Sequence, residues 1–124
     1  MIKFDSVSKR YPGGHEALLN VDFHLQEGEF AFLTGHSGAG KSTLIDIMLG
    51  LLEPTSGVIS VDSKIIDKQN IKSWQKNIGY VSQTIYLLDD TFRKNIAFGL
   101  SEEEIDENKI LNAIEHSYNE IDNT

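Results

Sequence analysis

One stretch of this sequence decides the fold: Gly35-His36-Ser37-Gly38-Ala39-Gly40-Lys41-Ser42-Thr43. It matches the pattern G-x-x-x-x-G-K-[ST], the phosphate-binding P-loop. Glycines let such a loop turn tightly, so that successive backbone N–H groups point inward at phosphate oxygens. The pattern predicts that Lys41 reaches the β- and γ-phosphates of a nucleotide and that the Ser42 hydroxyl binds Mg²⁺. The residues expected to bind the nucleotide here are Gly35, Ser37, Gly38, Ala39, Gly40, Lys41, Ser42 and Thr43.

The segments on either side of this loop have the character that the motif requires. Glu29–Thr34 is a nearly continuous apolar run of strand length, typical of a strand covered on both faces in a parallel sheet. Lys41–Leu52 is apolar nearly all round, which predicts a buried helix. The positive N-terminal end of that helix would face the same phosphates. Strand, loop and helix together predict a nucleotide-phosphate site.

Composition bounds the class of protein. The 124 residues are 40% hydrophobic and 24% charged, which is typical of one globular domain. Cysteine is absent, which excludes a disulfide scaffold and a thiolate metal site. The net charge of -8 argues against a nucleic-acid binder, which would need a basic stripe. No apolar run reaches membrane-span length and the first residues lack a signal-peptide core, so a cytoplasmic location is expected.

Local patterns predict further strands and helices. Strands are expected as an antiparallel pair within residues 2–25, at Val58–Val61 and at Ile78–Ser82. A short helix is expected over Asp90–Phe98. Ser101 and Glu104 fit a capping box that would begin a last helix. The apolar stripe of that helix would be Ile110, Ile114, Tyr118 and Ile121.

Motifs along the whole chain are similar to those of one protein family. Before the loop helix they are Phe4, Val7-Ser8, Tyr11, Ala17-Leu18, Gly28-Glu29 and Phe32–Thr43. These resemble ABC transporter-type ATPases, most closely the bacterial cell-division ATP-binding proteins. Beyond about Leu44 the motifs are Leu49–Gly57, Ile78–Gln83 and Thr91–Gly99, which resemble the ATPase domain of ABC exporters, with lipid-linked oligosaccharide flippases nearest. This change near the P-loop suggests a chimera of two ABC parents.

The resemblance implies an α/β fold of the P-loop NTPase class, ABC ATPase type, in an incomplete form within residues 1–124. An antiparallel β subdomain would take residues 1–28 and 56–66, and a partial parallel core sheet residues 29–54 and 78–83. Residues 84–124 would start a helical subdomain. The resemblance also implies that Tyr11 stacks on the adenine ring, and that the Gln83 amide, with Ser42, helps to hold Mg²⁺.

The family's hydrolytic motifs do not occur in this sequence. They are the Leu-Ser-Gly-Gly-Gln signature, an apolar strand ending in Asp-Glu, and a switch histidine. Asp89 follows an apolar run, but its place after Gln83 matches the family's lead into the helical subdomain. We therefore expect ATP and Mg²⁺ binding with no catalytic residue and no hydrolysis by the chain alone. The alternative is a structural or engineered fragment with weak or no nucleotide binding.

A small GTPase or kinase fits less well than either of these. The Asn108-Lys109-Ile110-Leu111 stretch fails the GTPase base-reading motif at its last position, and a kinase would need more arginines than Arg10 and Arg93.

The resemblance also implies partners and a location. Family members pair with a transmembrane permease at the cytoplasmic face of the inner membrane. In the family sheet, the strands matching Phe30–Thr34 and Ile78–Ser82 are separated by two strands that this sequence does not supply. Open, apolar strand edges recruit other strands. Self-association as a dimer or higher oligomer is therefore expected.

Overall fold

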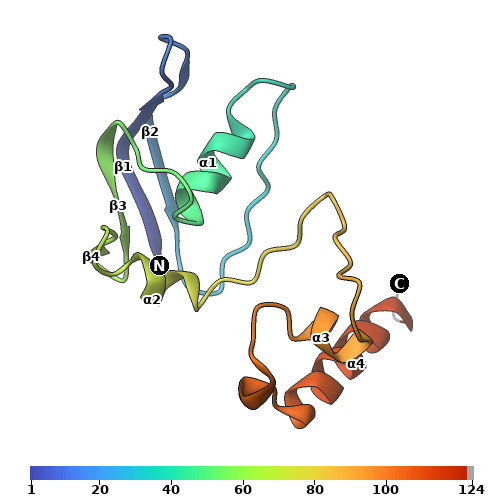
Figure 1. Ribbon diagram of the computed structural model, residues 1–124. Helices are drawn as coiled ribbons and strands as arrows, with labels where there is room; N and C mark the ends of the chain where they lie inside the picture. Colours follow the sequence, from blue (N-terminus) through green and yellow to red (C-terminus); the bar gives the residue numbers. More distant parts are fainter. Residues whose placement is uncertain (123–124) are drawn as a thin grey trace. The chain divides into compact units, whose positions relative to one another are not determined.

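A small antiparallel sheet forms the centre of the first part of the chain. The computed structural model describes residues 1–122 and divides into two units, Met1–Tyr80 and the residues from Val81 onward (Figure 1). The sheet belongs to the first unit and has the strand order β2-β1-β3-β4. Its strands are β1 (Ile2–Arg10), β2 (Glu16–Leu25), β3 (Ser56–Val61) and β4 (Lys64–Ile65). The predicted antiparallel pair and the predicted strand near residue 58 are thus confirmed.

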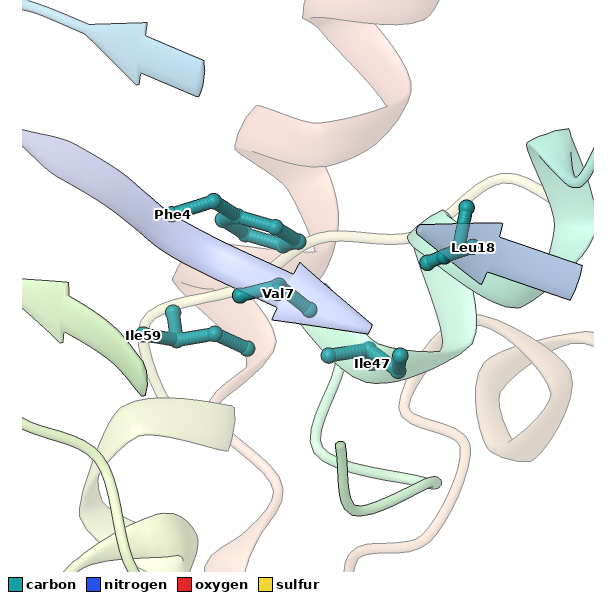
Figure 2. Close-up of a cluster of buried hydrophobic side chains, with 5 residues drawn as sticks. All are labelled: Phe4, Val7, Leu18, Ile47 and Ile59. Carbon is teal, nitrogen blue, oxygen red and sulfur yellow. The ribbon is translucent and has the colours of Figure 1, made fainter. Parts of the chain in front are cut away.

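The register of the sheet places apolar side chains on one face. Phe4 of β1 lies opposite Phe23 of β2 and Ile59 of β3. The Phe4 and Phe23 rings meet edge to face, with centroids 6.1 Å apart. The core cluster in Figure 2 consists of Phe4, Val7, Leu18, Ile47 and Ile59. This cluster buries the inner face of the sheet against the helix that follows the P-loop.

That helix is α1 (Lys41–Met48), and it ends earlier than predicted. Gly50 adopts φ +73°, in the left-handed region that ends helices, and its N–H donates to the carbonyl of Ile47 (3.0 Å). Only Thr43 and Ile47 of α1 are buried, so the prediction of a helix buried all round is wrong for the described residues. The other faces of α1 have too few neighbours in this unit to cover them.

A second short helix, α2 (Ile71–Gln75), lies against the C-terminal end of α1. The indole N–H of Trp74 donates to the carbonyl of Met48 (2.8 Å), and the side-chain amide of Gln75 donates to the carbonyl of Leu49 (3.0 Å). The last carbonyls of a helix have no partner within the helix, so these two bonds satisfy groups that would otherwise need water. Trp74 therefore serves to fix α1, and with it the loop that precedes α1.

Two predicted strands are wrong. Glu29–Thr34 and Ile78–Ser82 are extended segments without strand pairing in the part of the chain that the structure describes, and Figure 1 draws them as plain coil. Phe30 and Phe32 are 83% and 84% exposed. The physical reason is that a strand exists only through hydrogen bonds to a neighbouring strand, however apolar its sequence. All strand pairs among residues 1–122 are antiparallel, so the predicted partial parallel core sheet is not formed in this part of the chain.

The second unit is helical. It contains α3 (Phe92–Ile96), a 3₁₀ turn η1 (Glu102–Glu104) and α4 (Glu107–Asp122). The predicted capping box of Ser101 and Glu104 is present but caps η1. On α4, Ile110 is buried, whereas Tyr118 is largely exposed. The side chain of Ile121, the last member of the predicted stripe, lies outside the described residues.

Ion pairs connect the short elements of this second unit. Arg93 of α3 donates to the carboxylates of Glu102 (2.6 Å) and Glu107, and Lys94 lies 3.3 Å from both Asp90 and Glu102. The hydrogen bond from Arg93, followed by the one from Lys94, holds the pKa of Glu102 below its usual value. The same pairs raise the pKa of Arg93 and Lys94.

No helix within residues 1–122 is long and apolar enough to cross a membrane.

Candidate functional site

The P-loop takes a tight, glycine-dependent path between the extended segment and α1. Gly38 and Gly40 adopt φ of +82° and +95°, and the N–H of Ala39 donates to the carbonyl of His36 (3.1 Å). Gly40 is also the residue that caps α1. A Cβ on Gly40 would lie 2.5 Å from the carbonyl oxygen of Ala17 on β2, so both the backbone angle and the packing require glycine.

Lys41 folds back over this loop. Its ammonium donates to the carbonyl of His36 (2.9 Å) and to that of Gly35. These are weak, exchangeable partners for an ammonium, because phosphate oxygens offer it full negative charge. Lys41 is thus already held against the loop in which a phosphate group would sit.

The start of α1 adds backbone donors to the same place. Its first turn contains no acidic residue, and the first helical bond runs from the N–H of Leu44 to the carbonyl of Gly40 (2.9 Å). The N–H groups of Lys41, Ser42 and Thr43 therefore have no partner within the helix. Together with the helix dipole, they make this end of α1 suitable for an anion.

Tyr11 reaches the loop from the turn between β1 and β2. Its hydroxyl lies 3.1 Å from the hydroxyl oxygen of Thr43, which is buried at the start of α1. Lys9 approaches the Tyr11 ring, with its ammonium 5.7 Å from the ring centroid. The bond to Thr43 links the β1–β2 turn to the start of α1, so it holds the Tyr11 ring in place relative to the P-loop.

A cavity of about 430 Å³ lies between the turn and the loop. Its lining residues are Tyr11, His15, Ala17, Ser37, Gly38, Gly40, Lys41, Ser42 and Thr43. The structure therefore brings most of the predicted site residues to one place. Gly35 and Ala39 belong to the loop but not to the cavity lining. Gln83 is an exposed residue of the second unit, and its approach to the loop stays a prediction.

The sequence analysis missed His15. The N–H of Tyr11 donates to the carbonyl of His15 (2.8 Å), which closes the turn and sets the two residues opposite each other. Their rings are within 14° of parallel, with centroids 6.5 Å apart. The Tyr-Pro-Gly-Gly turn was the available signal, because a tight turn brings the residue that follows it back beside the one that precedes it.

Several hydroxyl oxygens line the cavity, and the Ser42 hydroxyl is the one that the P-loop pattern assigns to Mg²⁺. Ser42 lines the cavity beside Lys41. No cluster of three or more His, Asp or Glu side chains that could hold a metal exists within the described part of the chain. Mg²⁺ commonly keeps several waters and is bound through few protein oxygens plus substrate phosphates. The Ser42 hydroxyl beside the P-loop is compatible with that mode of binding.

Comparison with known proteins gives the family. The model of the family described as "ABC transporter" matches residues 18–123, which is most of the chain. The chain belongs to the ABC transporter ATPase family. Among solved structures, a dimeric ATP-binding cassette in a post-hydrolysis state with ADP and Pi superimposes with a TM-score of 0.70 at 32% identity. That match covers 84% of this chain and 52% of the other, and it confirms the predicted α/β P-loop class.

Two curated relatives represent the two resemblances in the sequence. The cell division ATP-binding protein FtsE of Escherichia coli K12 is 44% identical over 104 residues, 81% of this chain and 47% of its own length. The ATP-dependent lipid A-core flippase of Ralstonia nicotianae is 36% identical over 119 residues, 94% of this chain and 20% of its own. The chain thus spans less than half the length of either relative.

Both alignments extend across the P-loop of this ABC ATPase domain. An alignment that covers 81% or 94% of the chain includes residues on both sides of Thr43. The two resemblances therefore overlap over most of the sequence. A chimera of two parents is not needed to explain them and stays a hypothesis.

Proposed function

We propose that the chain binds ATP together with Mg²⁺ in the 430 Å³ cavity. The observation that carries the proposal is that one cavity is lined by the P-loop, the start of α1 and Tyr11. In this arrangement the backbone N–H groups and Lys41 bind phosphates, and Ser42 contributes one oxygen to Mg²⁺, which in turn neutralises phosphate charge. Tyr11 offers an aromatic face to the base.

The charges around the cavity support an anionic ligand. The whole chain carries a net charge of -8, yet none of the cavity-lining residues that the structure describes is a carboxylate. Lys41 and the N-terminal end of α1 are instead the charged features of the lining. A nucleoside triphosphate would thus be attracted by a local positive potential on an otherwise acidic domain.

We also propose that the chain alone does not hydrolyse ATP. Hydrolysis needs a group that orients or deprotonates water at the γ-phosphate. The acidic residue considered in the sequence analysis, Asp89, belongs to the second unit rather than to the cavity lining. The lining, within the described residues, contains no carboxylate, and its one imidazole, that of His15, lies in the turn beside Tyr11 and not in the P-loop.

Calorimetric titration with ATP and Mg²⁺ tests this function. The variant Lys41→Ala is expected to bind ATP at least tenfold more weakly, a loss of ~1.4 kcal/mol. Lys64→Ala, which removes an exposed lysine of β4 outside the cavity, is the matched control and should bind as the unsubstituted chain does. Phosphate release should stay at background. If Lys41→Ala bound ATP as tightly as the unsubstituted chain, the site would be refuted. If neither the unsubstituted chain nor either variant bound ATP, the result would favour the alternative of a structural fragment.

We propose that the exposed extended segments make the chain self-associate. Phe32 is 84% exposed in the segment before the P-loop, and Val81 is 95% exposed at the start of the second unit. Unpaired apolar strand-forming segments of this kind pair with other copies. Sedimentation equilibrium at micromolar concentrations should therefore give a mass above one chain, and a well-folded monomer would contradict the proposal.

As part of a longer protein, the domain would act with a transmembrane permease at the cytoplasmic face of the membrane. This proposal rests on membership of the ABC transporter family and on relatives whose names describe import and flipping, such as a phosphonates import ATP-binding protein of Hydrogenovibrio crunogenus.

A further inference from the structure

His15 is a cavity residue to which the proposed binding of ATP and Mg²⁺ assigns no role. His15 lies in the turn between β1 and β2 and lines the cavity together with the P-loop. Its side chain is exposed, and no hydrogen bond or ion pair holds its imidazole within the part of the chain described by the structure. The imidazole is therefore available to a ligand in the cavity.

The geometry of the turn pairs this imidazole with Tyr11. The two rings are within 14° of parallel and their centroids are 6.5 Å apart, inside the range over which aromatic rings interact. The backbone hydrogen bond from Tyr11 to His15 holds the two residues next to each other across the turn. The contact between the Tyr11 hydroxyl and Thr43 holds the far end of the Tyr11 side chain against α1. A flat base that contacts Tyr11 is consequently within reach of His15.

Lys9, whose ammonium approaches the Tyr11 ring, does not offer the base a second aromatic face. Lys9 donates its ammonium to the carbonyl of Glu53 (2.7 Å) and does not line the cavity. Of these two residues, His15 and not Lys9 brings a second flat, aromatic face to the cavity lining.

We propose that His15 is a specificity residue that, together with Tyr11, favours a nucleotide with a purine base. The inference rests on the proposed function and deepens it. The fused rings of a purine present a larger flat area to the two protein rings than the single ring of a pyrimidine does, so a second aromatic face should add more to purine binding. Stacking of this kind depends on flat area and not on hydrogen bonds, so it distinguishes ring size.

Titration of the full chain with three ligands tests the inference. The ligands are ATP, CTP and inorganic triphosphate, each with Mg²⁺. His15→Ala should lower the affinity for ATP about fivefold, the affinity for CTP less than twofold and the affinity for triphosphate not at all. His15→Phe, which keeps a flat ring, should restore ATP binding. His24→Ala, which removes an exposed histidine of β2 outside the cavity, is the matched control.

The outcomes separate this inference from the function on which it rests. No ATP binding by the unsubstituted chain would overturn both. ATP binding that His15→Ala leaves unchanged, or that falls equally for ATP and CTP, would overturn the inference alone. An equal loss for ATP and triphosphate would show that His15 acts on the phosphates, and this too would overturn it.

Discussion

Gly40→Ala is expected to lower the affinity of the chain for ATP at least about 30-fold, roughly 2 kcal/mol. Gly40 has φ +95°, a conformation that strains any residue with a Cβ. The added Cβ would also lie 2.5 Å from the backbone oxygen of Ala17, which cannot rotate away as a side chain could. The loop or β2 must shift, and the N–H groups that we propose bind phosphate shift with the loop. Calorimetric titration with ATP and Mg²⁺ measures the loss.

Gly28→Ala is the matched control for this effect. Gly28 also has a positive φ, +77°, but a Cβ there would meet no atom within 4 Å, and the residue lies outside the cavity. It should cost about 1 kcal/mol of stability through backbone strain and leave ATP affinity unchanged. If Gly40→Ala binds ATP as well as Gly28→Ala does, the loop geometry described here does not control binding.

Phe4→Ala is expected to lower the free energy of unfolding by about 3–5 kcal/mol. Phe4 is 1% exposed and lies where β1, β2, β3 and α1 meet (Figure 2). The truncation removes its edge-to-face contact with Phe23 and leaves a cavity that the surrounding strands cannot fill without distortion. Domains are stable by only about 5–15 kcal/mol, so the loss is a large share of the total. Urea denaturation followed by circular dichroism measures it.

Phe30→Ala makes the same chemical change at an exposed position. Phe30 belongs to the extended segment before the P-loop and is 83% exposed. Its truncation should change the free energy of unfolding by less than about 0.5 kcal/mol. Comparable losses for the two variants would mean that Phe30 is covered in solution, which would also bear on the proposed self-association.

The sequence was sufficient for the P-loop because the loop is built from local interactions. Gly38 and Gly40 take the positive φ angles that the motif requires, and α1 begins directly after them at Lys41. The turn after Tyr11 was likewise predictable, since a Pro-Gly-Gly run allows few conformations. In each case the residues that determine the structure are within a few positions of one another.

Strand pairing could not be predicted in this way. The apolar run Glu29–Thr34 has the composition of a buried strand but has no strand partner in the described residues, whereas β1 finds partners on both sides. Apolar composition makes burial favourable, but only a neighbouring strand satisfies the backbone N–H and C=O groups. The sequence of one segment contains no information about whether that neighbour is present.

By itself, then, the sequence determined the phosphate loop, the helix after it and the family, because these depend on residue types at fixed short spacings. The tertiary structure decided the remainder. In the folded chain, His15 lies beside Tyr11, and the Tyr11 hydroxyl contacts that of Thr43. Ala17 packs against Gly40, and the Trp74 indole donates a hydrogen bond to the C-terminal end of α1. Each of these contacts joins side chains or backbone groups on different elements. Such contacts depend on how the sheet and α1 pack in space, and no spacing along the chain specifies that packing.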